Sequence, residues 1–346
     1  MFSTAPRRRL VLLAAPVAVL ALALAGCSSS PSADSTSGDG ATKIAAVIKG
    51  LDNPFFQAME DGITETAEAA GVDVTVQAAA DIGDTTGQAD KLTTLSGQDF
   101  GCFIVNPISG TNLVQSLAPI AAAGKPIINI DQPIDEDAAE AADITPATYI
   151  GTDNEAAGEK AGDYIASLVD AGGEVAIIGG ISGDVTSAAR VDGFKDAVDG
   201  ALEIVQEDAA DWKREIALTK ATDIIAANPD IVAFFAANDD MGLGIVKAVE
   251  NSGKTGEIVV VSVDGNQDAL ESVEAGGLAA TVAQYPYAIG SLGVQACQVA
   301  LDGGDLPDDI ESPTALVNAD NAADAIASFP QPFEGFDNPL ADQLDE

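Results

Sequence analysis

From Lys43 onward the chain alternates short runs rich in Val and Ile with longer Ala-rich stretches of helical periodicity. The short runs are apolar on both faces, as parallel strands are when helices cover both sides of a sheet. We expect strands at 43–48, 72–78, 101–105, 126–130, 148–152, 174–179, 203–208, 231–236, 258–263, 279–283 and 314–318. We expect helices at 54–70, 85–97, 110–123, 154–170, 186–199, 213–227, 239–252, 267–275 and 286–302. This alternation predicts an α/β fold of doubly wound parallel sheets.

Six of the apolar runs are followed by a small polar side chain. These residues are Asn53, Asn106, Asp131, Asn238, Asp264 and Gln284. Parallel strands bring their carboxyl ends to one edge of an open sheet, where ligands bind, so we expect the six side chains to line a crevice. Carboxylates and carboxamides offer hydroxyl groups the acceptors and donors that they need. The pattern predicts a sugar-like ligand that is held rather than transformed.

Four further side chains suit such a ligand. Arg190 offers a fork of donors and offsets a buried carboxylate, while Phe55, Phe56 and Trp212 offer rings to the C–H faces of a sugar. Each also has a purely structural interpretation. Arg190 could be a solvated helix charge, the Phe pair could belong to the core, and Asn53 could serve only as a helix cap. Trp212 is the only Trp and lies in a polar segment, where a core role is less natural.

The first 26 residues read as a secretory signal, because Arg7, Arg8 and Arg9 precede an apolar run and a small-residue cleavage site. The segment Leu24 to Cys27 resembles a bacterial lipobox, which implies cleavage before Cys27 and a lipid on its sulfur. The alternative is an uncleaved membrane anchor, for which the apolar run is short. Residues 27–42 then form the lipidated Cys and a flexible Ser- and Gly-rich tether.

Charge and composition exclude several classes of function. The chain has 15 Lys and Arg against 55 Asp and Glu, a net charge of −40, so its surface repels nucleic acid. It contains no histidine, which removes His-based triads, His general bases and most zinc and iron sites. We therefore expect no enzymatic activity, no catalytic residue, no metal and no cofactor. Cys102 and Cys297 look like small buried hydrophobic residues, and a disulfide between them is left open.

Several stretches with the strand-end residues carry a resemblance to a known family. They are NPFFQAMEDGITETAEAAG, FIVNP, PIINID, YIGTDNEAAGEKAGDYIA, TSAARVDGFKDAV, FFAANDDMGLG, VVSVDG, GGLAATVAQYP and LVNADN. In order and spacing the chain resembles the ribose-type sugar-binding proteins of bacterial ABC transporters, in the type I periplasmic-binding-protein superfamily. The resemblance runs from about Lys43 to Asn321.

This resemblance implies two Rossmann-like lobes joined by three hinge crossovers, with ligand clamped between them. Lobe one should be 43–152 plus 285–312, and lobe two 153–284 plus 313–322. We expect 323–346 to be an acidic tail, and the Pro- and acid-rich composition from Phe329 onward predicts that this part wraps the surface or is disordered. Carried over by position, the ligand-binding residues are Asn53, Phe55, Phe56, Asn106, Asp131, Gln132, Arg190, Trp212, Asn238, Asp264 and Gln284. The implied role is capture of a monosaccharide or sugar alcohol and delivery to an ABC permease. The implied place is the outer face of the cell membrane, where the chain is anchored by Cys27 as a monomer.

One position departs from the ribose pattern, which has Arg directly after the strand-end Asp131. Here that position is Gln132, so two acids face the single cation of Arg190. A buried unpaired carboxylate is costly, so we expect extra ligand hydroxyls, water or a cationic group on the ligand to compensate. This departure counts against ribose itself as the ligand.

Three other functions are weighed against transport. A transcriptional repressor with this fold should have a basic helix-turn-helix before Lys43, where a secretory leader stands instead. A glycosidase could use Asp131 and Asp264 as a carboxylate pair. A receptor for a signalling furanone or another non-nutrient ligand would keep the same binding site.

Overall fold

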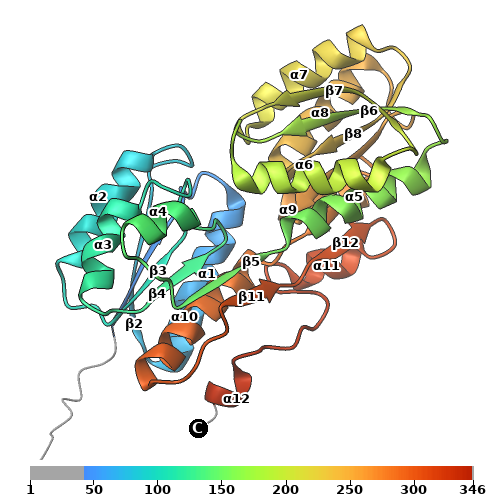
Figure 1. The fold of residues 1–346 in the computed structure, drawn as a ribbon. Coiled ribbons are helices and arrows are strands. Elements are labelled where there is room, and N and C mark those ends of the chain that lie inside the picture. Colours follow the sequence, from blue (N-terminus) through green and yellow to red (C-terminus); the bar gives the residue numbers. More distant parts are fainter. Residues whose placement is uncertain (1–42, 345–346) are drawn as a thin grey trace, which may run out of the picture. The chain divides into compact units, whose positions relative to one another are not determined.

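A computed structural model describes residues 43–344, with the predicted leader, Cys27 and tether outside the described residues (Figure 1). The strands are β1 (Lys43–Ile48), β2 (Asp73–Ala78), β3 (Cys102–Val105), β4 (Ile127–Ile130), β5 (Thr148–Thr152), β6 (Glu174–Gly179), β7 (Glu203–Ala209), β8 (Ile231–Ala236), β9 (Val259–Asp264), β10 (Ala280–Ala283), β11 (Asp309–Ser312) and β12 (Ala315–Asn318). The helices are α1 (Pro54–Ala70), α2 (Thr85–Ser96), α3 (Val114–Ala122), α4 (Glu136–Ala141), α5 (Asn154–Leu168), α6 (Val185–Val198), α7 (Arg214–Ala227), α8 (Asp239–Ser252), α9 (Gln267–Glu274), α10 (Pro286–Asp302), α11 (Ala322–Ser328) and α12 (Ala341–Leu344).

The strands form two six-stranded sheets, which define two lobes. Lobe one has the order β11-β5-β4-β3-β1-β2, and lobe two has the order β12-β10-β9-β8-β6-β7. All pairs are parallel except β10 with β12, which run antiparallel at the edge of lobe two. Helices cover both faces of each sheet (Figure 1). The predicted architecture of two doubly wound parallel-sheet lobes is confirmed.

Both faces of each sheet bury apolar side chains. In β1, Ile44 and Ile48 pack toward α1 and α10, whereas Ala45 and Val47 pack toward α2 and α3 on the opposite face. This two-sided burial follows from the continuous apolar runs in the sequence. The sheets therefore present only their edges to solvent, and the loops after their strands supply the polar groups.

The predicted helix ends agree with the structure. Asn53 caps α1, Pro54 occupies its first turn, and Gly71 ends it with φ = 69°. The three other glycines predicted to follow helices, Gly124, Gly200 and Gly253, also adopt positive φ. Local sequence therefore fixes where the helices stop, and so which loops reach the sheet edges.

Four elements were not predicted: β11, α4, α11 and α12. Strand β11 (DIES) and helix α4 (EDAAEA) are short and carry few apolar residues, so they have almost no periodic signal. Helix α11 lies within the segment that we expected to be an acidic tail, but it packs on α9 and β12 of lobe two.

After α11 the chain continues along both lobes. Phe329 and Phe333 pack against the core of lobe two, and Phe336 contacts the cores of both lobes. Leu340 is completely buried in lobe one, and Asn338 Nδ2 donates to Gln295 Oε1 of α10 at 2.8 Å. The segment thus follows the protein surface and connects one lobe with the other.

The two cysteines that the sequence left unassigned form a disulfide. Cys102 in β3 and Cys297 in α10 have Cα atoms 5.8 Å apart and are 195 residues apart in sequence. The bond joins a strand of lobe one to a helix that the chain forms only after it has passed through lobe two. Within residues 43–344, no helix is both long and apolar enough to span a bilayer.

Candidate ligand-binding site

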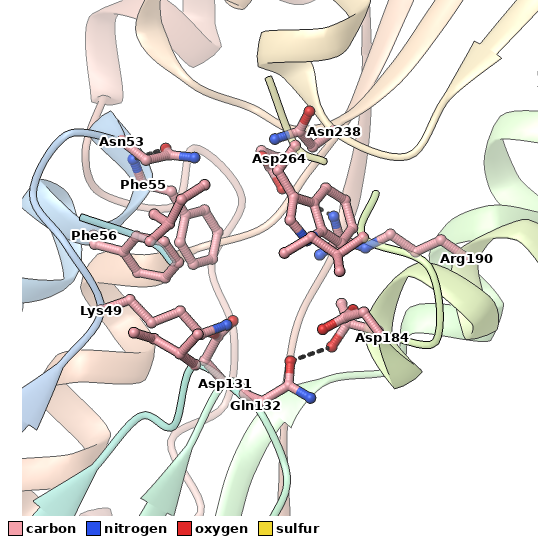
Figure 2. A pocket seen from close by; sticks show the side chains of 15 residues that line it. Lys49, Asn53, Phe55, Phe56, Asp131, Gln132, Asp184, Arg190, Asn238 and Asp264 are labelled. Atoms are coloured by element: carbon pink, nitrogen blue, oxygen red, sulfur yellow. Dashed lines mark hydrogen bonds and ion pairs between the residues drawn. The ribbon is translucent and has the colours of Figure 1, made fainter. Parts of the chain in front are cut away.

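One pocket is lined by side chains from the strand ends of both lobes (Figure 2). Nine of the eleven predicted ligand residues line it: Asn53, Phe55, Phe56, Asp131, Gln132, Arg190, Trp212, Asn238 and Asp264. In the close-up, Asn53 and the two Phe rings lie across an open space from Asn238, Asp264 and Arg190. The topology therefore brings together residues more than two hundred positions apart, as expected for side chains at the carboxyl ends of parallel strands.

Lobe one supplies an amide and two aromatic rings from the start of α1. Asn53 Oδ1 accepts a hydrogen bond from the Phe55 N–H at 2.9 Å, which leaves Asn53 Nδ2 as a donor. The Phe55 and Phe56 rings pack edge to face with centroids 5.2 Å apart, and both are almost fully buried. The structural interpretations of these residues are thus correct, and the same residues also line the pocket.

Asp131 follows β4 and has a left-handed backbone with φ = 60°. Lys49 Nζ lies 3.2 Å from Asp131 Oδ2 and 5.2 Å from the centroid of the Phe56 ring. Our expectation that Asp131 lacks a protein cation is therefore wrong. Lys49 stands just after β1, which is separated from β4 by β3 in the sheet. Its flexible side chain spans this distance and reaches Asp131.

Asp264, at the end of β9, is held by an ordered network in lobe two. Arg190 Nη1 donates to Asp264 Oδ1 at 3.2 Å and to the Ala237 carbonyl at 2.7 Å. Arg190 Nε donates to Asn154 Oδ1 at 2.9 Å, and Gln284 Nε2 donates to Asp264 Oδ1 at 2.7 Å. Both bonds to the acid use Oδ1, which leaves Oδ2 available to a ligand. Arg190 is thus a buried partner of the acid and not a solvated charge.

A second acid lies directly behind Asp264. Asp239 is fully buried and accepts hydrogen bonds from Ser262 Oγ at 2.5 Å, Thr281 Oγ1 at 2.7 Å and the Asn266 N–H at 2.8 Å. Burial raises the pKa of Asp239 well above its ordinary value, and the nearby Asp264 adds to that shift. Burial also raises the pKa of Asp264 to about 6, against the opposing effect of the Arg190 guanidinium.

Trp212 lies in the β7–α7 loop, as predicted. Asp211 and Trp212 both have positive φ, at 52° and 61°, and this turn carries the indole over Gly180. A Cβ at Gly180 would come within 2.2 Å of the Trp212 ring, so only glycine allows the contact. The Arg190 guanidinium carbon is 5.8 Å from the Trp212 ring centroid. The only Trp of the chain is therefore fixed in the wall of the pocket.

Two predicted residues are not among those that line the pocket. Gln284 is buried and supports Asp264 through the bond described above. Asn106 is fully buried, with its Nδ2 3.4 Å from Met59 Sδ. Within the described residues its Oδ1 has no hydrogen-bond partner, so an acceptor is left unsatisfied at the end of β3.

Six lining residues were missed from the sequence: Lys49, Ile82, Ile108, Ile181, Asp184 and Thr186. Lys49 follows a predicted strand, so the expectation that polar residues after strands line the crevice could have identified it. Asp184 caps α6, with Oδ1 accepting from the Ser187 N–H at 2.8 Å. The three Ile residues lie in loops, and no periodic pattern distinguishes them from other apolar residues.

The chemistry of the lining suits a neutral hydroxyl-rich molecule. Two acid–cation pairs offer charged donors and acceptors, while the amides of Asn53 and Asn238 and three aromatic rings complete the set. Among residues 43–344, no cluster of three or more acidic or Cys side chains could hold a metal ion.

The described geometry agrees with comparisons to known proteins. The family model of the periplasmic binding protein domain matches residues 44–305. The chain belongs to the periplasmic binding protein family. The D-allose-binding periplasmic protein of Escherichia coli (strain K12) is 39% identical over 264 residues, which are 75% of this chain and 85% of the relative. The ribose import binding protein of Bacillus subtilis (strain 168) is 32% identical and covers 78% of this chain and 85% of the relative.

Solved structures of the family share the fold. A periplasmic solute binding protein of an ABC transporter from Actinobacillus succinogenes 130z, with bound D-allose, has a TM-score of 0.78 and 30% identity, and the match covers 82% of this chain and 99% of that one. A solute binding protein from Bacillus halodurans C-125 with bound myo-inositol has a TM-score of 0.76 and 26% identity over 84% of this chain and 99% of that one. The predicted family and fold class are confirmed.

Proposed function

We propose that this protein captures a neutral monosaccharide or sugar alcohol between its two lobes and delivers it to an ABC permease. The observation that carries the proposal is the convergence of polar strand-end side chains from two separate sheets on one pocket with aromatic walls. Relatives named for D-allose and ribose, and a structural neighbour with bound myo-inositol, support the ligand class. We propose lobe limits of 43–152 plus 285–312 and 153–284 plus 313–322, in keeping with the strand content of the two sheets.

D-allose is the first candidate ligand. Lys49 gives Asp131 a cation in the place where the ribose pattern has Arg next to the acid, so no cationic ligand is needed. The lysine stem adds an apolar surface beside Phe56. A relative at 39% identity and a solved neighbour at 30% identity are both associated with D-allose. The Lys49–Asp131 pair suits any neutral sugar, and the two relatives associated with D-allose make this hexose the first candidate.

Each lining group has a proposed role. The Asp131 and Asp264 carboxylates accept from ligand hydroxyls, while Arg190, Lys49, Asn53 and Asn238 donate to ligand oxygens. Phe55, Phe56 and Trp212 pack on the C–H faces of the ring. Asn106 does not line the pocket, but its unsatisfied Oδ1 at the end of β3 would accept a hydroxyl of a ligand that reaches it. Gln284 holds Asp264 in position.

Titration calorimetry with D-allose, D-ribose, D-fucose and myo-inositol tests the proposal. We expect at least one of these to bind with Kd near micromolar, about −8 kcal/mol. Replacement Asp264→Asn should weaken that binding by about 2–5 kcal/mol, because it removes a charged acceptor and leaves Arg190 unpaired. Thr219→Val, on the exposed face of α7, is the control and should leave Kd unchanged. Failure of every probe to bind more tightly than about 1 mM would refute the proposal.

We also propose that the mature chain begins at a lipidated Cys27 and acts at the outer face of the membrane as a monomer. The leader sequence and the extracytoplasmic family support this assignment. Mass spectrometry of the membrane-extracted protein should show diacylglycerol on Cys27. Cys27→Ala should leave the protein unprocessed or release it from the membrane fraction, and unchanged membrane retention of a processed Cys27→Ala chain would contradict the anchor.

No observation favours the glycosidase alternative. Asp131 and Asp264 are each paired with a cation of their own lobe, and each already has a role in ligand binding in the proposed function. A chromogenic glycoside assay should show no turnover above the buffer rate.

A further inference from the structure

Gln132 and Thr186 make the one side-chain hydrogen bond that joins the two lobes across the pocket, among the bonds described for residues 43–344. Thr186 Oγ1 donates to Gln132 Oε1 at 3.0 Å (Figure 2, dashed line at Gln132). Gln132 stands two residues after β4 of lobe one, and Thr186 lies in the first turn of α6 of lobe two. The bond therefore exists only while the lobes are close together.

The ion pairs, in contrast, do not depend on how close the two lobes are. The eight ion pairs recorded among the described residues each join residues of one lobe, including Lys49–Asp131 and Arg190–Asp264 beside the pocket. Contacts within a lobe move with it and persist when the lobes separate. A contact present in one state only shifts the equilibrium toward that state by its own net free energy. Among these polar contacts, the Gln132–Thr186 bond is thus the one that distinguishes closed from open lobes.

Both partners are held in place within their own lobes. The Gln132 carbonyl accepts from Asn129 Nδ2 at 2.8 Å, and Asn129 Oδ1 accepts from the Ile134 N–H at 2.8 Å. Gln132 is only 2% exposed. Thr186 is fixed by the capped start of α6, where Asp184 accepts from the Ser187 N–H. Little additional ordering is needed when the bond forms, so most of its free energy can stabilise closure.

We propose that Gln132 and Thr186 form an interlobe latch, which slows lobe opening without direct contact between Gln132 and the ligand. This inference rests on the proposed function, because it concerns release of the sugar. A latch of this kind raises affinity for every ligand by the same factor. One net hydrogen bond corresponds to a factor of about 2–10 in Kd.

Stopped-flow fluorescence tests the latch, because Trp212 is the only Trp and lines the pocket. With D-allose and D-ribose as probes, Thr186→Val should raise the dissociation rate about 2–10-fold for both, with little change in association rate. Thr186→Ser, which keeps the hydroxyl, should restore the wild-type rate. Thr219→Val is the matched control, since it removes a helix hydroxyl that bonds only within α7.

A double-mutant cycle with Gln132→Leu separates the latch from a direct ligand contact. Gln132→Leu should cost the same factor as Thr186→Val, and the double variant should be no worse than either single one. A cost of Gln132→Leu that differs between the two sugars, strictly additive losses, or an unchanged dissociation rate would each overturn the latch. If wild-type protein binds none of D-allose, D-ribose, D-fucose and myo-inositol, the proposed function fails and the latch fails with it. If the wild-type protein binds a sugar and Thr186→Val leaves the dissociation rate unchanged, the latch is refuted but the proposed function is not.

Discussion

Asp131 and Asp264 occupy equivalent places in the two lobes. Each follows a central strand, each has positive φ, at 60° and 137°, and each is paired at 3.2 Å with a cation from its own lobe. Such backbone conformations are costly for non-glycine residues and persist where the surroundings enforce them. The pairing holds both carboxylates in position before any ligand arrives, which reduces the cost of reorganisation on binding.

At the first of these acids, Lys49→Met should weaken sugar binding about 30-fold, or about 2 kcal/mol, because Asp131 loses its cation in a largely buried site. Lys49→Arg should retain most of the affinity. Lys125→Met is a suitable control, since Lys125 lies over the Phe103 ring in lobe one but does not line the pocket. Calorimetry that shows equal Kd for Lys49→Met and wild type would exclude Lys49 from recognition.

We expect Asp264 to make ligand binding pH-dependent. The pKa of Asp264 is raised to about 6 by burial, so the free protein takes up a proton there as pH falls through about 6. A ligand hydroxyl donates a stronger hydrogen bond to the carboxylate than to the carboxylic acid, so Kd should rise below pH 6, at most tenfold per pH unit. Affinity should be nearly constant between pH 7 and 8. The dependence should be lost in Asp264→Asn, and a rise in affinity on acidification would contradict this assignment.

Secondary-structure elements place the site, and most of them could be predicted from sequence. The continuous apolar runs and glycine stops located eleven strands and nine helices, because long buried segments have strong periodic signals. Short or polar elements such as β11 and α4 could not be predicted. The place of Lys49 after a strand could be predicted, but its pairing with Asp131 could not, because that pairing depends on β1 and β4 lying on either side of β3. The buried cluster around Asp239 was missed for the same reason.

Helix α8 depends on that cluster. Asp239 lies in its first turn and accepts three hydrogen bonds, including one from the Asn266 N–H beyond β9. Asp239→Ala leaves three buried donors without a partner and should lower the free energy of unfolding by about 3 kcal/mol. Asp240→Ala, at the next position and in a partly exposed pair with Arg214, should cost about 1 kcal/mol or less. Urea denaturation followed by circular dichroism measures both; equal losses would show that the cluster is not what stabilises the start of α8.

At the scale of the whole molecule, the chain leaves lobe one, builds most of lobe two and returns. The Cys102–Cys297 disulfide links the outgoing and returning parts, and both cysteines lie in the core of lobe one. The C-terminal segment adds a further contact between the lobes through Phe336 and Leu340. The disulfide holds lobe one together independently of whether lobe two has closed on a ligand.

Replacement of both cysteines by Ala should lower the free energy of unfolding by about 2–5 kcal/mol, since a long loop in the unfolded chain is no longer closed. Sugar affinity should stay unchanged, because neither cysteine lines the pocket. Differential scanning calorimetry and titration calorimetry measure the two quantities. A large loss of affinity in a folded double variant would indicate that the bond also sets the geometry of the pocket.

The disulfide has one more consequence, which concerns proteolysis. Because the loop between Cys102 and Cys297 contains residues 103–296, a protease that cuts any single peptide bond in β6 to β10 releases no fragment. A nicked molecule should run as one band on a non-reducing gel and as two bands after reduction. The severed ends stay tethered at high effective concentration, so a protein exposed to extracellular proteases can survive a cut in its second lobe as a single covalent particle.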